Sequence, residues 1–124
     1  MNITIIGTGY VGLVTGTCFT EMGNTVTCVD IDQQKIDNLN KGIIPIYEPG
    51  LEELIKSNSA ANRLFFTKSL KAAMKNSNMF LIAVGTPESP NGEANMDFVY
   101  SAAREIGQNL EKESVIVNKS TVPV

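Results

Sequence analysis

Gly7-Thr8-Gly9-Tyr10-Val11-Gly12 follows the apolar run Ile3-Thr4-Ile5-Ile6 and precedes a segment with helical periodicity. A strand, a glycine-rich turn and a helix in this order are typical of a dinucleotide-binding site. In such a turn Gly7 allows the tight exit from the strand, Gly9 lets the backbone approach a pyrophosphate, and Gly12 lets the helix pack closely. The helix N-terminus then binds phosphate oxygens. The motif predicts a bound pyrophosphate, although glycine is common in any tight turn.

An acidic residue follows the second expected strand, Thr25-Val26-Thr27-Cys28-Val29. Asp30 stands 18 residues after Gly12, where a carboxylate can accept both ribose hydroxyls of an adenosine. Its charge repels a 2′-phosphate, so Asp30 favours NAD over NADP. Lys35 complicates this preference because a cation can tolerate a phosphate. The alternative interpretation of Asp30 is a solvated turn residue at a strand end.

The length and net charge of the chain argue against several classes of protein. With 124 residues and 43% hydrophobic content, the chain can form one domain but not a nucleotide domain and a full substrate domain. A net charge of −3 without a run of Lys or Arg argues against binding to nucleic acid or an anionic membrane. The longest apolar run, residues 79–84, is too short for a membrane span. Because Met1-Asn2 leads directly into a strand, we expect no signal peptide and a cytoplasmic location.

The chain contains no His and two cysteines, Cys18 and Cys28. Without His, neither a zinc site nor a Ser-His-Asp hydrolase site is expected, and we predict no metal. Both cysteines fall where an expected helix or strand should face the core, so we interpret them as reduced packing residues. A catalytic thiol or a disulfide is the alternative.

Strand and helix signals alternate along the chain, which predicts an α/β fold with a Rossmann-type, doubly wound parallel sheet in three layers. We expect five strands, at residues 3–6, 25–29, 64–67, 79–84 and 114–118, with the sixth strand of a complete dinucleotide fold missing. The last strand is then expected to be an unpaired edge with exposed apolar surface.

Helical spacing predicts which residues face the sheet. Asp32 and Asn95 are suited to cap helices, and Gly16 suggests either a close helix approach or simple tolerance of glycine. The expected inner faces are Val11, Val14, Cys18 and Met22; Ile36 and Leu39; Leu51, Leu54 and Ile55; Leu70, Ala73 and Met74; and Val99, Ala102, Ile106 and Leu110.

Two more segments fall at the carboxyl ends of expected strands, where open parallel sheets bind ligands. Gly85-Thr86-Pro87 follows the fourth strand, and Lys119-Ser120-Thr121 follows the fifth. Their hydroxyls and amides can bind ribose or nicotinamide groups. The alternative is that both segments simply turn the chain.

Several blocks along the whole chain resemble, in the same order, the amino-terminal domain of the UDP-glucose 6-dehydrogenase family. They are Gly7 to Val14, Val29-Asp30-Ile31-Asp32, Pro45-Ile46-Tyr47-Glu48-Pro49-Gly50-Leu51, Val84-Gly85-Thr86-Pro87 and Lys119-Ser120-Thr121-Val122-Pro123-Val124. The resemblance implies a homodimeric parent enzyme that oxidises the C6 alcohol of UDP-glucose to the carboxylate with two NAD. Dehydrogenases of GDP-mannose and UDP-N-acetylmannosamine share the glycine turn and are the alternative within this class.

The resemblance also implies site residues. Asp30 and Lys35 correspond to contacts with the adenosine ribose, and Thr121 to an auxiliary catalytic position near the nicotinamide that helps to hold water or substrate. The expected cofactor-binding residues are Gly7, Gly9, Tyr10, Val11, Gly12, Asp30, Lys35, Val84, Gly85, Thr86, Pro87, Ser120 and Thr121. The nucleophilic Cys of the family lies downstream of the last block, so neither cysteine of this chain inherits its role.

Residues 1–124 therefore correspond to an NAD-binding domain without the family's central helix and UDP-sugar domain, and we expect it to bind NAD without turnover. Asn95 replaces an Asp that is usual in the family, with little expected effect because both residues cap helices. Two other hypotheses are a non-catalytic nucleotide-binding module and, less favoured, a flavin or S-adenosylmethionine protein.

Overall fold

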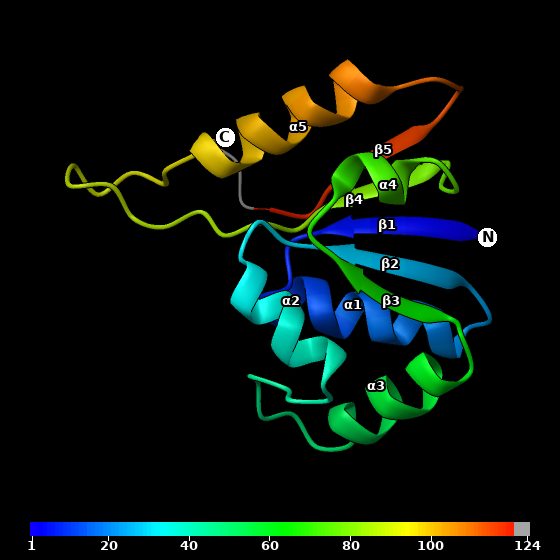
Figure 1. Cartoon of the computed structure of the whole chain (residues 1–124). Coiled ribbons are helices and arrows are strands. Elements are labelled where there is room, and N and C mark those ends of the chain that lie inside the picture. Colours follow the sequence, from blue (N-terminus) through cyan, green and yellow to red (C-terminus); the bar gives the residue numbers. More distant parts are fainter. Residues whose placement is uncertain (121–124) are drawn as a thin grey trace.

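The computed structural model describes residues 1–120 and contains five strands and five helices within them (Figure 1). The strands are β1 (Asn2–Ile6), β2 (Thr25–Val29), β3 (Leu64–Thr67), β4 (Met79–Ile82) and β5 (Val115–Asn118). The helices are α1 (Tyr10–Glu21), α2 (Gln33–Asn40), α3 (Leu51–Ala60), α4 (Leu70–Met74) and α5 (Asp97–Asn109). The elements follow the alternation that the sequence predicts.

All strand pairs are parallel, and the sheet order is β3-β2-β1-β4-β5. Figure 1 shows α1, α2 and α3 on one face of the sheet and α4 and α5 on the other. This arrangement confirms the predicted doubly wound α/β fold with three layers. The direction of winding reverses between β1 and β4, and ligands of open α/β sheets bind at such a reversal.

Alternating side chains of the central strands form two separate cores. On β1, Ile3 and Ile5 face α1 to α3, whereas Ile6 packs with the residues of α4 and α5. Thr4 also lies under α4, where its hydroxyl donates to the Ser77 Oγ at 2.7 Å. Phe80 on β4 is 1% exposed and is the largest fully buried side chain of the described residues. Burial on both faces explains the nearly continuous apolar character of these strands.

The predicted inner face of α1 is confirmed only at Val14, which is partly buried against the core, and is wrong at the other three residues, including Val11. Cys18 and Met22 are exposed, and the buried residues of α1 are Gly12, Leu13, Gly16, Thr17 and Thr20. A Cβ on Gly16 would lie 3.0 Å from the Cys28 Sγ and 3.1 Å from the Ile5 Cδ1, so the helix approaches the sheet closely. Small residues permit this approach, and Leu13 is the one large apolar residue among the buried residues of α1.

Three other details differ from the expectations. β4 ends at Ile82 rather than Val84, and Leu110 lies beyond the end of α5, 42% exposed. The N-cap of α5 is Met96, but the Asn95 Oδ1 accepts from the Asp97 amide at 2.9 Å and so turns the chain into the helix. Asp32 caps α2 as predicted, with its side chain accepting from the amides of Gln34 and Lys35.

β5 forms one edge of the described sheet. Val115 and Ile116 are 56% and 47% exposed, which confirms the expectation of open apolar surface on the last strand. Of the helices found in residues 1–120, none has the length and apolar character needed to cross a bilayer.

Candidate cofactor site

The parallel register brings four predicted segments to one edge of the sheet, which lies at the arrowheads in Figure 1. The Gly7 amide donates to the Val29 carbonyl at 2.7 Å, which joins the glycine turn to the end of β2. The Ala83 amide donates to the Ile6 carbonyl at 2.8 Å, and the Ser120 amide to the Ile82 carbonyl at 3.1 Å. Residues from four strand ends therefore surround the point where the winding reverses.

The three glycines of the turn serve different purposes. Gly7 has a φ of +112°, and a Cβ there would collide with the carbonyl of Ala83. A Cβ on Gly12 would collide with the Gly7 carbonyl oxygen, so Gly12 lets α1 begin directly against the turn. Gly9 has an ordinary φ of −74°, and a Cβ would meet no protein atom within 4 Å. Neither conformation nor packing of the described chain requires glycine at position 9, which faces open space.

The N-terminus of α1 presents free donors beside that space. The first N–H groups of an α-helix lack intrahelical acceptors, and no side chain caps them in α1. The first turn of α1 carries no acidic residue, and the positive end of the helix dipole favours an anion there. Tyr10 and Val11, which begin the helix, are 53% and 46% exposed. This combination suits an anion such as a pyrophosphate.

Asp30 is held firmly at the end of β2. Its Oδ2 accepts from the Thr8 amide at 2.9 Å and from the Thr8 hydroxyl at 2.6 Å, and its Oδ1 accepts from the Asp32 amide at 3.0 Å. Partial burial raises the pKa of Asp30, but the bonds from Thr8 and Asp32 and the charge of Lys35 outweigh it and hold the pKa below its ordinary value. Asp30 is therefore an ionised carboxylate at neutral pH.

Thr8 and Glu48 are two residues of this site that the sequence reasoning missed. Thr8 is 1% exposed, and its position between two glycines was the only signal in the sequence. The Tyr10 hydroxyl donates to the Glu48 Oε2 at 3.0 Å, which links the glycine turn to the loop before α3. This hydrogen bond, followed by the charge of Glu48, raises the pKa of Tyr10.

The other predicted segments line the same edge. The Ser120 hydroxyl donates to the Val84 carbonyl at 2.9 Å, so this side chain connects the ends of β5 and β4. Val84 and Thr86 are half-buried, whereas Gly85 and Pro87 are exposed. Thr121, the expected auxiliary catalytic residue, lies outside the described residues.

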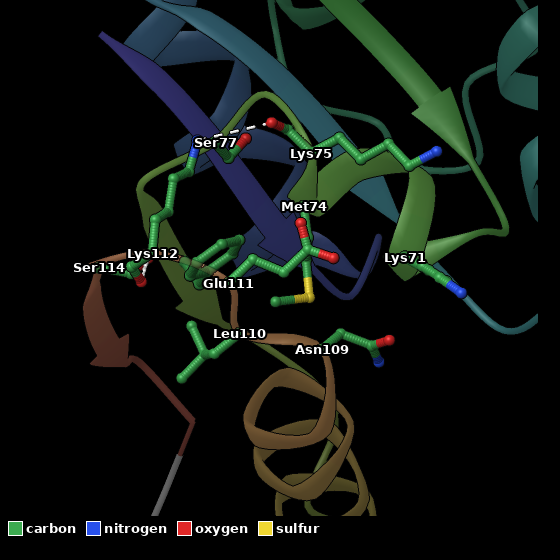
Figure 2. Close-up of a pocket in the computed structure, with 10 residues that line it drawn as sticks. Lys71, Met74, Lys75, Ser77, Asn109, Leu110, Glu111, Lys112 and Ser114 are labelled. Atoms are coloured by element: carbon green, nitrogen blue, oxygen red, sulfur yellow. Dashed lines mark hydrogen bonds between the residues drawn. The ribbon is translucent and has the colours of Figure 1, made fainter.

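A small pocket lies at the opposite, amino-terminal edge of β4 and β5 (Figure 2). Three lysines line it, but the Lys112 ammonium donates to the Lys75 carbonyl at 3.5 Å, and Figure 2 shows those of Lys71 and Lys75 pointing away from it. The lysines do not converge on a common point, so the pocket is not built for an anion. Its lining residues are Lys71, Met74, Lys75, Ser77, Phe80, Asn109, Leu110, Glu111, Lys112 and Ser114.

Comparison with known families identifies this architecture. Residues 1–124 match the NAD-binding domain of the UDP-glucose/GDP-mannose dehydrogenase family. The chain belongs to this family. It is the family's NAD-binding domain, which confirms the resemblance seen in the sequence and the expected cofactor.

Individual members of the family support the assignment. The chain is 56% identical over 123 residues to the UDP-glucose 6-dehydrogenase TuaD of Bacillus subtilis, and the match covers 99% of this chain and 27% of that protein. Identity to a UDP-glucose 6-dehydrogenase of Rhizobium meliloti is 55% over 125 residues, covering 100% of this chain and 29% of that protein. The chain thus spans little more than a quarter of the length of these curated relatives.

Solved structures of the family have the same fold. A GDP-mannose dehydrogenase of Pseudomonas aeruginosa superposes with a TM-score of 0.93 and 38% identity, over 98% of this chain and 29% of that one. A UDP-glucose dehydrogenase of Pyrobaculum islandicum gives a TM-score of 0.91 and 36% identity over the same shares. The backbone fold is therefore common to members with different sugar substrates in their names.

The residues of this chain fit the family's cofactor. Open space at Gly9 and the uncapped N-terminus of α1 suit a pyrophosphate, and the ionised Asp30 beside them suits a ribose. These features come from two parts of the chain, the glycine turn and the end of β2, and meet at one edge of the sheet. The fit is thus independent of the family match.

Proposed function

We propose that this chain is the cofactor domain of an enzyme that oxidises the C6 alcohol of UDP-glucose to the carboxylate of UDP-glucuronate. The single observation that carries the proposed binding of NAD is the ionised carboxylate of Asp30. It lies at the carboxyl end of β2, next to the open face of the glycine turn. The UDP-glucose part is supported by relatives of 46–56% identity that carry this activity in their names.

The expected site residues have proposed roles, with Gly7 and Gly12 shaping the turn. The amides near Gly9, Tyr10 and Val11 would bind the pyrophosphate, and Asp30 with Lys35 would bind the adenosine ribose. NAD, when bound, supplies a hydride acceptor; the chain's own residues bind it and orient it. The remaining proposed contacts are Val84, Gly85, Thr86, Pro87 and Ser120 at the ends of β4 and β5, together with Thr121, which lies outside the described residues.

The preference for NAD is tested by calorimetric titration of the chain with NAD and, in parallel, with NADP. We expect saturable binding of NAD and at least about tenfold weaker binding of NADP, because Asp30 repels a 2′-phosphate. Asp30→Ala should weaken NAD binding and reduce the preference. If a folded wild-type chain binds the two cofactors equally, the ribose role of Asp30 is wrong.

The dehydrogenase role is tested by a chimera in which this chain replaces the matching segment of the Bacillus subtilis relative TuaD. We expect NADH formation with UDP-glucose and a strong decrease in the Asp30→Ala chimera. A folded chimera that binds NAD without turnover would instead favour a non-catalytic nucleotide-binding module.

A related nucleotide sugar is the second candidate substrate, because the GDP-mannose dehydrogenase of known structure is as similar in fold as the UDP-glucose enzyme. The natural protein that contains this chain should be assayed with UDP-glucose, GDP-mannose and UDP-N-acetylmannosamine. Our proposal expects the highest kcat/KM for UDP-glucose. We also propose that the enzyme is a homodimer, which analytical sedimentation would test. We further propose that it is cytoplasmic, which cell fractionation would test.

A further inference from the structure

Thr8 directs both of its donors at one atom. Its amide and its hydroxyl lie 2.9 Å and 2.6 Å from the Asp30 Oδ2, although the two residues are 22 positions apart in the sequence. The side chain is 1% exposed, so water does not compete for this hydroxyl. Bonds to an ionised acceptor are stronger than bonds between neutral groups. Thr8 therefore ties the glycine turn to the end of β2.

Because of these bonds, the two carboxylate oxygens of Asp30 differ in how many hydrogen bonds they can still accept. An ionised carboxylate offers about two acceptor positions on each oxygen. Thr8 occupies both positions on Oδ2, whereas the Asp32 amide occupies one on Oδ1, at 3.0 Å. The remaining acceptor capacity of Asp30 lies on Oδ1. A ribose hydroxyl would therefore bind Oδ1, at an orientation that Thr8 determines.

We propose that Thr8 is a positioning residue that sets the preference for NAD over NADP, by fixing the Asp30 carboxylate so that its Oδ1 faces the adenosine ribose. This inference rests on the proposed cofactor role of Asp30. Thr8 does not touch the cofactor in this mechanism; it acts through the carboxylate. The direction of the Asp30 pKa, which the Thr8 bonds lower, agrees with the geometry.

The decisive variant is Thr8→Val, which removes the hydroxyl but keeps the size and branching of the side chain. Thr8→Ser restores the hydroxyl without the methyl group. Thr17→Val is a matched control, because Thr17 is also 1% exposed but its hydroxyl donates at 2.8 Å to the Leu13 carbonyl within α1. Circular dichroism and thermal unfolding establish that each variant is folded.

Calorimetric titrations of the full chain with NAD and NADP measure the preference directly. We expect Thr8→Val to reduce the ratio of the two affinities by about tenfold, whereas Thr8→Ser and Thr17→Val keep it within about twofold. An unchanged ratio in a folded Thr8→Val variant would overturn the role of Thr8. Failure of the wild-type chain to bind NAD would instead count against the proposed function.

A second measurement does not need the cofactor. Titration of the Asp30 carboxyl carbon by NMR should give a higher pKa in Thr8→Val than in the wild-type chain, and a value close to wild type in Thr8→Ser. If Thr8→Val does not fold, Thr8→Ala serves as the variant that lacks the hydroxyl. An equal Asp30 pKa with and without the hydroxyl would overturn the inference whatever the binding data show.

Discussion

Gly16 of α1 lies directly against Cys28 of β2, because a Cβ on the glycine would be only 3.0 Å from the cysteine sulphur. The same Cβ would be 3.1 Å from the Ile5 Cδ1, so strands on both sides confine it. This contact sets how closely α1 approaches the sheet.

Gly16→Ala should destabilise the chain despite the better helix propensity of alanine. Overpacking a close contact costs about 1–3 kcal/mol, which exceeds the gain of about 1 kcal/mol from replacing a mid-helix glycine. Gly107→Ala in α5 is the matched control, since a Cβ there meets nothing within 4 Å and should stabilise slightly. Urea unfolding measures both changes; a stable Gly16→Ala variant would show that the contact relaxes easily.

Alanine substitutions at Gly9 and Gly12 should have different effects: the first should weaken NAD binding, and the second should lower the stability of the fold. Gly9→Ala meets no protein atom, so we expect a loss of less than about 1 kcal/mol in the free energy of unfolding but at least about tenfold weaker NAD binding. Gly12→Ala forces a collision with the Gly7 carbonyl and should lower stability by at least about 2 kcal/mol. Unfolding curves and calorimetry distinguish the two. Normal NAD affinity in Gly9→Ala would argue against a pyrophosphate at this turn.

The two cysteines should differ strongly in reactivity. Burial raises the pKa of the Cys28 thiol to about 12, which suppresses the reactive thiolate, whereas Cys18 is exposed on α1. Under native conditions iodoacetamide should modify Cys18 and leave Cys28 intact, as mass spectrometry of the peptides would show. In denaturant both should react. Equal native labelling would mean that α1 separates readily from the sheet.

Because of Asp30, the free energy of unfolding should decrease as the pH falls into the acid range. Folding lowers its pKa below the ordinary value of 3.8, so the unfolded chain binds this proton more readily. The stabilising contribution is therefore complete above that value and is lost as the pH falls through the lower folded pKa. The difference in unfolding free energy between the wild type and Asp30→Asn should shrink over this range.

Glu105→Gln is the control for the pH series, because Glu105 is exposed on α5, on the opposite face of the sheet from α1 (Figure 1). We expect its unfolding free energy to follow that of the wild type at each pH. A difference between wild type and Asp30→Asn that stays constant from neutral to acid pH would show that folding does not lower the Asp30 pKa.

Much of the fold was predictable because the signals for it are local. The third strand was predicted with the residues that form β3, and Asp32 was predicted as the cap of α2, since strand patterns and caps depend on neighbouring residues. The buried face of α1 was not predictable in this way. Apart from Leu13, the buried residues there are glycine and threonine, and an apolar pattern cannot reveal a surface that small residues largely form.

The sequence by itself determined the class of the site: a glycine turn after a strand, an acid after the next strand, and blocks typical of one dehydrogenase family. Only the tertiary structure decided how the site is held. The bonds from Thr8 to Asp30 and from Tyr10 to Glu48 join residues 22 and 38 positions apart. Such contacts arise when parallel pairing and helix packing bring distant segments together, and no local pattern in the chain encodes them.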